Sequence, residues 1–423
     1  MDSSLPKATR PKALALLLML PWLSSCTWRP AASIPQVFAV SGSPEEMASY
    51  RQLLADFTLA HPEAQWKLQE IPQDSTQALE ACKSFFTEKG PAVRVVSIGS
   101  DGIPTLSSAG MLERLDSYFP PTSLASFGRL PDELDRFNGT LYAIPWSVEV
   151  NLLFGNKKLL DPLGLKNPPE NFDDMLRFAR LVKRASWTKG ENVEGMLWPG
   201  DAAMRPLDSF IEAYVRAGGD LATVEHEGRW NSRPAYDALD ELQSIFLSGL
   251  VPKSTLAGFS RQEARILFQQ GGAALMRNNS RVAPLMEGPT SRLKGAFWAV
   301  PLPGPGSHAG PAVLGGRQLA LGAGSGARGA DLIRFLSSNE TQMRMAQNFG
   351  WSPSRLSLYQ DLGGSTDPRL AHLGAVRQAL RNAVVRPHSP RGQADAAQCR
   401  DLLRRALSGD LTIRQAADLL SKP

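Results

Sequence analysis

The chain has 423 residues, of which 43% are hydrophobic and 21% charged, a composition typical of a globular protein long enough for two domains. Its formal net charge of +5 falls to +3 without residues 1–25, which carry Asp2 and three basic residues. That charge is too weak to indicate nucleic-acid binding, and no basic block or aromatic–basic interleaving supports it. The five histidines lack metal-ligand spacing, so we expect neither a metal nor a cofactor.

The N-terminus has the pattern of a secretion signal. A basic start with Lys7, Arg10 and Lys12 precedes the apolar run Ala13–Leu20, which is too short for an ordinary transmembrane span. The following Leu-Ser-Ser-Cys resembles the lipobox of bacterial lipoproteins, in which Cys26 is lipidated and becomes the mature N-terminus. This predicts an extracytoplasmic protein held on a membrane, with residues 26–34 as a tether. The alternative is an uncleaved membrane anchor with an incidental cysteine.

The remaining cysteines, Cys82 and Cys399, leave two interpretations open. They form a disulfide in an oxidising compartment, or they are two unpaired thiols in the core.

Strands and helices alternate in the first part of the mature chain. Gln36–Val40 is predicted as a buried strand, and Ser43-Pro44-Glu45-Glu46 starts a helix with a capping box. Further strands are predicted at Trp66–Ile71 and Val93–Ile98, with a helix near 75–88 between them. This alternation indicates a parallel, doubly wound sheet with helices on both faces.

The rest of the chain is richer in helix. Leu141–Phe154 is predicted as a long strand interrupted at Pro145, and a second capping box starts at Ser260. Further strands are expected at Phe297–Leu302 and Leu319–Leu321. Helices are expected near residues 171–184, 203–217, 233–248, 260–270, 328–337, 339–348, 369–385, 393–407 and 412–421.

Six motifs in order resemble the family 1 extracellular solute-binding proteins, the maltose-binding-like group. The strongest is the segment FNGTLYAIPWSVEVNLLFGNK, which starts at Phe137 and is similar to the family's "dGklYgiPy…lyyNK". The other similar segments are Phe38–Pro62, Gly90-Pro91 followed by Val95–Asp116, Glu263–Glu287, Val313–Ala320 and Gly350–Pro353. Each motif is weak alone, but their order behind a lipobox makes the resemblance specific.

The resemblance implies an α/β, two-lobed periplasmic-binding-protein fold whose chain crosses three times between lobes, near Ser147, Trp298 and Met345. The N-terminal lobe would comprise residues 35–147 and 298–345, and the C-terminal lobe residues 148–297 and 346–423. It further implies a monomer that captures a sugar-like solute in the interlobe cleft and delivers it to an ABC importer. The permease and ATPase subunits would be other chains.

The resemblance also suggests ligand-binding residues, each with an alternative role. Trp146 and Glu149 lie on the first crossing, where the family's maltose-binding members contribute a carboxylate; a hinge residue satisfied by local backbone is the alternative. Trp351 lies in a region that supplies a stacking aromatic, and the alternative is a core tryptophan.

Three loop residues are further candidates. Asp101 follows a predicted strand where the family often places a ligand-contacting Asp, although an Asx turn or helix cap explains it equally well. Ser41 lies in the first strand-to-helix loop. Asp201 lies in a loop that the family uses at the cleft, and the alternative is an exposed turn residue.

Two positions depart from the family pattern. Many sugar-binding members carry Trp where this chain has Arg281, after Asn279-Ser280, and Arg317, after Gly315-Gly316. The resemblance makes Asn279, Arg281, Gly316 and Arg317 candidates for ligand binding. The guanidinium fork suits carboxylate or phosphate, so the ligand is expected to be polar, small or anionic: a disaccharide, glycosylglycerol, glycosylglycerate or glycerol phosphate. The alternative is that either arginine pairs with Glu149, Asp101 or Asp201.

Two other classes of protein compete with this interpretation. A secreted hydrolase would need an acid and a base or nucleophile, but the chain has no G-x-S-x-G elbow, zinc spacing or P-loop, and we expect no enzymatic activity. A lipoprotein that only senses ligand or serves as a scaffold would share the fold.

Overall fold

The structure is a computed structural model that describes residues 34–88, 92–200, 205–227, 230–306, 308–362, 365–387 and 393–421. From Pro35 onward these residues form one compact unit. The predicted lipidation site Cys26, its tether and the candidate Asp201 lie outside the described residues.

The strands form one mixed sheet and a small hairpin. The sheet order is β2-β1-β3-β10-β6-β8-β7, with β11 paired to β10 and β9 paired to β6. The strands are β1 (Gln36–Val40), β2 (Trp66–Glu70), β3 (Val93–Gly99), β4 (Arg136–Phe137), β5 (Thr140–Leu141), β6 (Ala143–Asn156), β7 (Glu194–Leu197), β8 (Ala273–Asn279), β9 (Phe297–Pro301), β10 (Ala312–Leu321) and β11 (Ala383–Val384).

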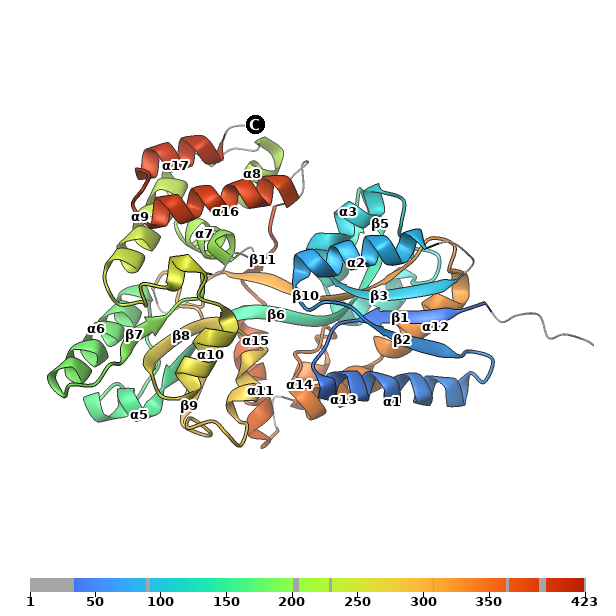
Figure 1. Cartoon of the computed structure of the whole chain (residues 1–423), viewed down its shortest axis with the longest axis horizontal. Helices are drawn as coiled ribbons and strands as arrows, with labels where there is room; N and C mark the ends of the chain where they lie inside the picture. Colours follow the sequence, from blue (N-terminus) through green and yellow to red (C-terminus); the bar gives the residue numbers. More distant parts are fainter. Residues whose placement is uncertain are drawn as a thin grey trace, which may run out of the picture. The chain divides into compact units, whose positions relative to one another are not determined.

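Helices cover this sheet, and several further helices make up much of the C-terminal part of the chain (Figure 1). They are α1 (Pro44–Ala60), α2 (Ser75–Thr87), α3 (Ile103–Ser108), α4 (Pro121–Leu124), α5 (Lys157–Leu160), α6 (Phe172–Thr188), α7 (Arg205–Arg216), α8 (Leu221–Glu227), α9 (Arg233–Leu247), α10 (Arg261–Gln269), α11 (Val282–Met286), α12 (Gly326–Leu336), α13 (Asn339–Phe349), α14 (Leu358–Leu362), α15 (Leu373–Ala379), α16 (Gln393–Leu407) and α17 (Ile413–Leu420).

The first three strands confirm the predicted parallel, doubly wound arrangement. Strand β1 pairs in parallel with β2 on one edge and with β3 on the other. Successive side chains of a strand point to opposite faces, so Phe38 packs in one hydrophobic cluster with Tyr50 of α1, and Ala39 packs in another with Leu79 of α2. Figure 1 shows α1 and α2 on opposite sides of these strands. The two clusters together are called the N-terminal core below.

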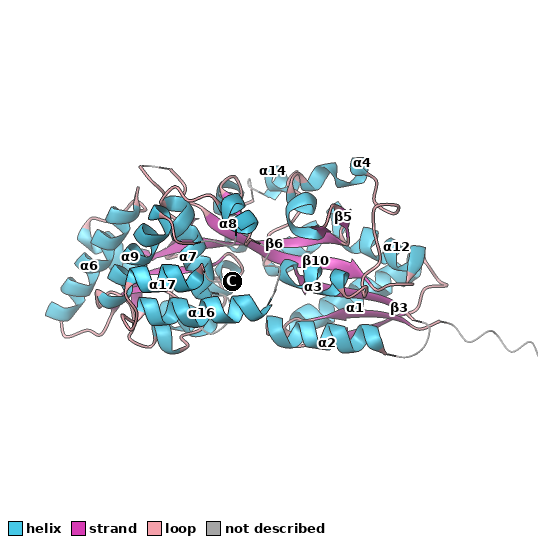
Figure 2. Cartoon of the chain, turned by 90° about the horizontal axis from the view of Figure 1, so that it is seen from above, coloured by secondary structure: helices cyan, strands magenta, loops and turns pink. Residues whose placement is uncertain are grey.

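Strands β6 and β10 join the N-terminal core to a separate C-terminal core. Strand β6 pairs with β10 over Ala143–Val150, and then with β8 and β9 over Asn151–Asn156. Ile144 belongs to the N-terminal core, whereas Leu152 belongs to the C-terminal core. Figures 1 and 2 both show β6 and β10 side by side. The molecule therefore has a boundary that these two strands pass through.

Near two of the three expected crossings, neighbouring residues of the chain pack in different cores. Ser147 lies on β6 at the boundary, and Met345 belongs to the N-terminal core while Ala346 belongs to the C-terminal one. Trp298, in contrast, lies on β9 beside the C-terminal end of β6 and packs against the C-terminal core. The packing favours a crossing within β10, because Leu314 and Leu319 of that strand lie in different cores. The lobe limits themselves stay a prediction.

Several elements differ from the sequence-based expectation. The segment expected as one helix over 369–385 contains the short helix α15 and ends in β11, where Ala383 pairs with Ala312. Strands β7 and β8 were not predicted, and β10 is longer than the expected Leu319–Leu321. In each case the sheet partner is distant in sequence, so local periodicity alone does not indicate a strand.

Three further observations concern the cysteines, membrane spans and metal sites. Cys82 and Cys399 do not form a disulfide. Among the described residues, no helix combines the length and apolar character needed to cross a bilayer. The same part of the chain holds no group of three His, Cys, Asp or Glu side chains placed to bind a metal.

Candidate functional site

Five of the predicted site residues meet at the boundary between the two cores. They are Glu149 on β6, Asn279 at the end of β8, Arg281 just before α11, Arg317 on β10 and Trp351 after α13, and all five are partly or fully buried. With Glu46 they form a set of contacts that we call the boundary cluster. Its members come from segments up to 305 residues apart, so only the tertiary structure brings them together.

Glu46 is the centre of the boundary cluster, and sequence reasoning assigned it only to a helix cap. One carboxylate oxygen, Oε2, accepts the backbone N–H of Ser43 at 2.8 Å and completes the predicted capping box. The other, Oε1, accepts Trp351 Nε1 at 2.8 Å and Arg281 Nη2 at 2.6 Å. The capping-box pattern alone does not distinguish Glu46, because Glu263 forms the same box at Ser260 and is exposed.

Arg281 connects the C-terminal core to Glu46 and Glu149. Its Nη1 lies 3.5 Å from Glu149 Oε1, and its guanidinium lies 5.2 Å from the centre of the Trp351 ring. Burial lowers the pKa of Arg281, but the neighbouring Glu149 and Glu46 outweigh burial and raise it overall. Asn279 Nδ2 donates to Glu149 Oε2 at 2.8 Å, so this carboxylate has partners on both oxygens. The expected Arg281–Glu149 pairing is therefore present.

Arg317 has different surroundings. Its Nη1 donates to the carbonyl oxygen of Ser41 and, at 3.4 Å, to Tyr50 Oη, and its guanidinium lies 5.3 Å from the Trp351 ring centre. Burial and the nearby Arg281 charge lower the pKa of Arg317. Within the described part of the chain it forms no ion pair within 4.0 Å. Ser41 thus approaches the cluster through its backbone.

The two candidate tryptophans lie in the N-terminal core. Trp146 is 1% exposed and donates its Nε1 hydrogen to the Leu336 carbonyl at 3.0 Å, and Trp351 is 4% exposed. Their ring centres are 5.1 Å apart in an edge-to-face arrangement. A sugar needs an open ring face to stack on, so this packing favours the core role for Trp146. Within the boundary cluster, Trp351 contacts Arg281, Arg317 and Glu46.

Gly316 occupies a position that only glycine accommodates. Its φ of +141° lies in the region that other residues avoid, and an added Cβ would lie 2.0 Å from the Ser147 carbonyl oxygen. The pairing register of β10 and β6 shifts directly afterwards, between Arg317 and Gln318. The backbone geometry accounts for this glycine by itself, and a ligand contact there stays a prediction.

Asp101 forms no ion pair with the arginines of the boundary cluster, although Gly99, two residues earlier, pairs with Arg317 across β3 and β10. It is exposed in the short 3-10 helix Ser100–Gly102, at the end of β3 as expected. Its charge contributes to raising the pKa of Arg386, which precedes α16. Asp101 is therefore near a second group of polar residues, which belongs to the C-terminal core.

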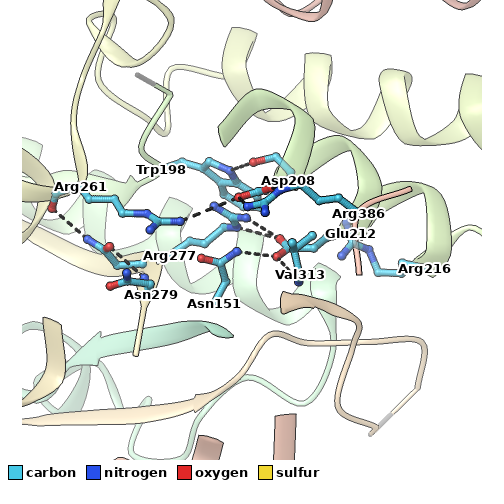
Figure 3. A network of polar contacts seen from close by, with 12 residues as sticks. Asn151, Trp198, Asp208, Glu212, Arg216, Arg261, Arg277, Asn279, Val313 and Arg386 are labelled. Carbon is cyan, nitrogen blue, oxygen red and sulfur yellow. Dashed lines mark hydrogen bonds and ion pairs between the residues drawn. The ribbon is translucent and has the colours of Figure 1, made fainter. Parts of the chain in front are cut away.

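This second group, called the buried network below, centres on Glu212 of α7 (Figure 3). Arg277 donates to Glu212 Oε2 from Nη2 at 2.6 Å and from Nε at 2.9 Å, and both side chains are 2% exposed. The other oxygen accepts Asn151 Nδ2 at 2.7 Å and the Val313 N–H at 3.0 Å. Each carboxylate oxygen thus has two donors, as a buried charge requires.

Asp208, which lies one helical turn before Glu212 on α7, also belongs to the buried network. Arg386 donates to it through Nε at 2.6 Å and Nη2 at 3.0 Å, and Arg261 lies 3.9 Å away (Figure 3). Burial raises the pKa of Asp208, but Arg386, Arg261 and Arg277 together outweigh burial and lower it overall. Of the residues labelled in Figure 3, only Asn279, which is drawn beside the network, was a sequence-based candidate.

Comparison with known proteins defines the class. Residues 41–343 match the family model described as bacterial extracellular solute-binding protein, which covers more than half of the chain. The protein therefore belongs to this family, as its motifs predict.

Individual relatives and structures agree with that assignment. The chain is 26% identical over 340 residues to a probable ABC transporter-binding protein of Deinococcus radiodurans, covering 77% of each chain. It is 23% identical over 359 residues to the maltotriose-binding protein of Pyrococcus abyssi, covering 82% of this chain and 72% of that one. Among solved structures it resembles maltose-bound MalE3 of T. maritima, with a TM-score of 0.77, 24% identity, and coverage of 91% and 98%. The predicted α/β, two-lobed periplasmic-binding-protein fold is thus confirmed.

Proposed function

We propose that this protein is the solute-binding component of an ABC importer and captures a sugar or sugar-like solute at the boundary between its lobes. The names of its relatives support the importer role, since they include an ABC transporter-binding and a maltotriose-binding protein. The observation that carries the proposal is the boundary cluster, in which Arg281 of one core contacts Glu46 of the other. A solute held there would contact both lobes at once.

The chemistry of the cluster suits a polyhydroxylated ligand. Sugar hydroxyls both donate and accept hydrogen bonds, and Glu149, Asn279 and Arg281 offer planar acceptor and donor groups in fixed geometry. Their side chains already bond one another, so a ligand would exchange with these contacts. Such exchange at a boundary crossed by β6 and β10 fits hinge closure around a ligand.

The proposal includes an extracytoplasmic location, a lipid anchor on Cys26 and a monomeric state. Its permease and ATPase partners would be separate chains, and no catalytic role is assigned. Several acyl chains hold a protein stably on a membrane, whereas one binds marginally. Replacing Cys26 by Ala is expected to release the protein from the membrane fraction of cells. Unchanged fractionation would overturn the anchor while leaving the binding role intact.

Thermal denaturation of the purified full chain with a panel of neutral disaccharides, glycosylglycerols and their acidic analogues tests the binding role. A ligand at about 100 times its Kd adds about 2.7 kcal/mol to the free energy of unfolding. Replacing Glu149 by Gln is expected to abolish that gain. Glu194→Gln is the matched control, because Glu194 has a similar exposure of 22% against 20% but pairs with Lys183 away from the cluster.

A gain that persists in the Glu149→Gln protein would move the site away from the boundary cluster. No gain with any sugar, neutral or acidic, would contradict the proposed function.

A further inference from the structure

Arg317 has an edge that no described residue uses. Its hydrogen bonds to the Ser41 carbonyl and the Tyr50 hydroxyl both come from Nη1. The Nε–Nη2 edge, which binds carboxylates through two parallel hydrogen bonds, makes none with the described residues. In contrast, Arg277 and Arg386 each use this same edge on Glu212 and Asp208. Arg216 also uses this edge, on Glu241. These three arginines have the edge occupied by a carboxylate, whereas among the described residues the edge of Arg317 is open.

The nearby carboxylates are already committed. Glu46 accepts from Ser43, Trp351 and Arg281, and Glu149 accepts from Asn279 and contacts Arg281. Neither lies within 4.0 Å of the Arg317 nitrogens. Arg281 and Arg317 also approach the same Trp351 ring, at 5.2 and 5.3 Å. The positive charge of Arg281 disfavours the charged form of the nearby Arg317, so an added anion would be stabilised there.

We propose that the ligand is an acidic sugar whose carboxylate binds the Nε–Nη2 edge of Arg317. This inference rests on the proposed function and narrows its ligand class. A carboxylate suits this edge, because Arg317 forms no ion pair with the described residues, whereas Arg281 has two carboxylate neighbours. A dianionic phosphate would add two negative charges beside Glu46 and Glu149, where a carboxylate adds one.

Titration calorimetry of the full chain with matched acid and neutral sugars tests the assignment. The pairs are glucosylglycerate with glucosylglycerol, glucuronate with glucose, and galacturonate with galactose. In at least one pair the wild-type protein is expected to bind the acid about tenfold or more tightly, the effect of charge-assisted hydrogen bonds. In the Arg317→Gln protein this ratio is expected to fall to about one. Arg317→Lys, which keeps the charge but not the fork, should give an intermediate ratio.

Arg344→Gln is the control, because it removes the same charge from α13, where Arg344 pairs with Asp56 of α1 outside the cluster. It should keep the wild-type ratio. The wild-type measurement tests the proposal even if an Arg317 variant does not fold. Neutral sugars binding as tightly as their acids would overturn the inference and leave the proposed function standing. Tighter binding of glycerol 3-phosphate would overturn the carboxylate assignment, and binding of no sugar would overturn both proposals.

Discussion

The buried network and the boundary cluster are built from the same groups but are packed differently. In the buried network, Arg277 and Glu212 are both 2% exposed, and every oxygen of Glu212 has two donors. In the boundary cluster, Arg281 is 26% exposed and contacts Glu46 of the opposite core, and Arg317 has no carboxylate partner among the described residues. The first group joins elements of one core, whereas the second joins two cores.

This difference separates a structural role from a binding role. A buried ion pair that is fully hydrogen-bonded strongly opposes the loss of either partner, because the remaining charge would be buried without compensation. A partly exposed set with an open guanidinium edge can instead exchange partners with a solute. Mutations should therefore affect stability in the buried network and ligand binding in the boundary cluster.

The largest effect on stability is expected from Glu212→Gln. This change leaves the Arg277 charge buried without its partner, so the free energy of unfolding should fall by about 3–5 kcal/mol. Chemical denaturation measures the loss. Asp237→Asn, which breaks the exposed i,i+4 pair with Arg233, should cost less than about 1 kcal/mol. Equal losses in the two variants would contradict a structural role for the buried Arg277–Glu212 pair.

Asp208→Asn adds a dependence on pH. The pKa of Asp208 is lowered in the folded state, so its ion pair with Arg386 stabilises the fold above the unfolded value of about 3.9 and loses this effect as pH falls below it. At pH 7 the variant should lose about 2–3 kcal/mol, the size of a charge-assisted hydrogen bond. Denaturation from pH 7 to pH 3 should show this difference shrinking in acid. A constant difference would contradict the assignment.

Gly316→Ala tests the boundary itself. The added Cβ would lie 2.0 Å from the Ser147 carbonyl, and the φ of +141° is unfavourable for alanine, so a loss of about 1–3 kcal/mol is expected. Gly315→Ala is the matched control, because its Cβ would have its nearest neighbour at 3.9 Å. Similar melting temperatures for the two variants would contradict the expected strain at Gly316.

Asp135 provides the opposite case, a carboxylate buried without a partner. It is 0% exposed, and neither oxygen has a hydrogen-bond partner among the described residues, so burial raises its pKa well above the ordinary value. Its contribution to stability therefore becomes unfavourable as pH rises above about 3.9. Asp135→Asn should gain about 1–2 kcal/mol at pH 7, with a smaller gain near pH 4. Denaturation at the two pH values checks this, and a loss at pH 7 would reveal a required charge.

The sequence predicted the fold wherever local patterns were strong. The alternation of β1, α1, β2, α2 and β3 and the capping boxes at Ser43 and Ser260 all appear as expected, because they depend on neighbouring residues. Strand β8 was not predicted, and β10 was predicted only over Leu319–Leu321. Both depend on pairing with β6, which lies more than 100 residues away in the chain.

The same division applies to the candidate site. The sequence by itself determined which side chains were available, and it singled out Glu149, Asn279, Arg281 and Arg317. Only the tertiary structure decided their partners: it gave Arg281 two carboxylates, left Arg317 with an open edge, and joined Glu46 to Trp351. It also placed Trp146 inside a core. The physical reason is that charge pairing and burial depend on distances between remote segments, which local sequence patterns do not contain.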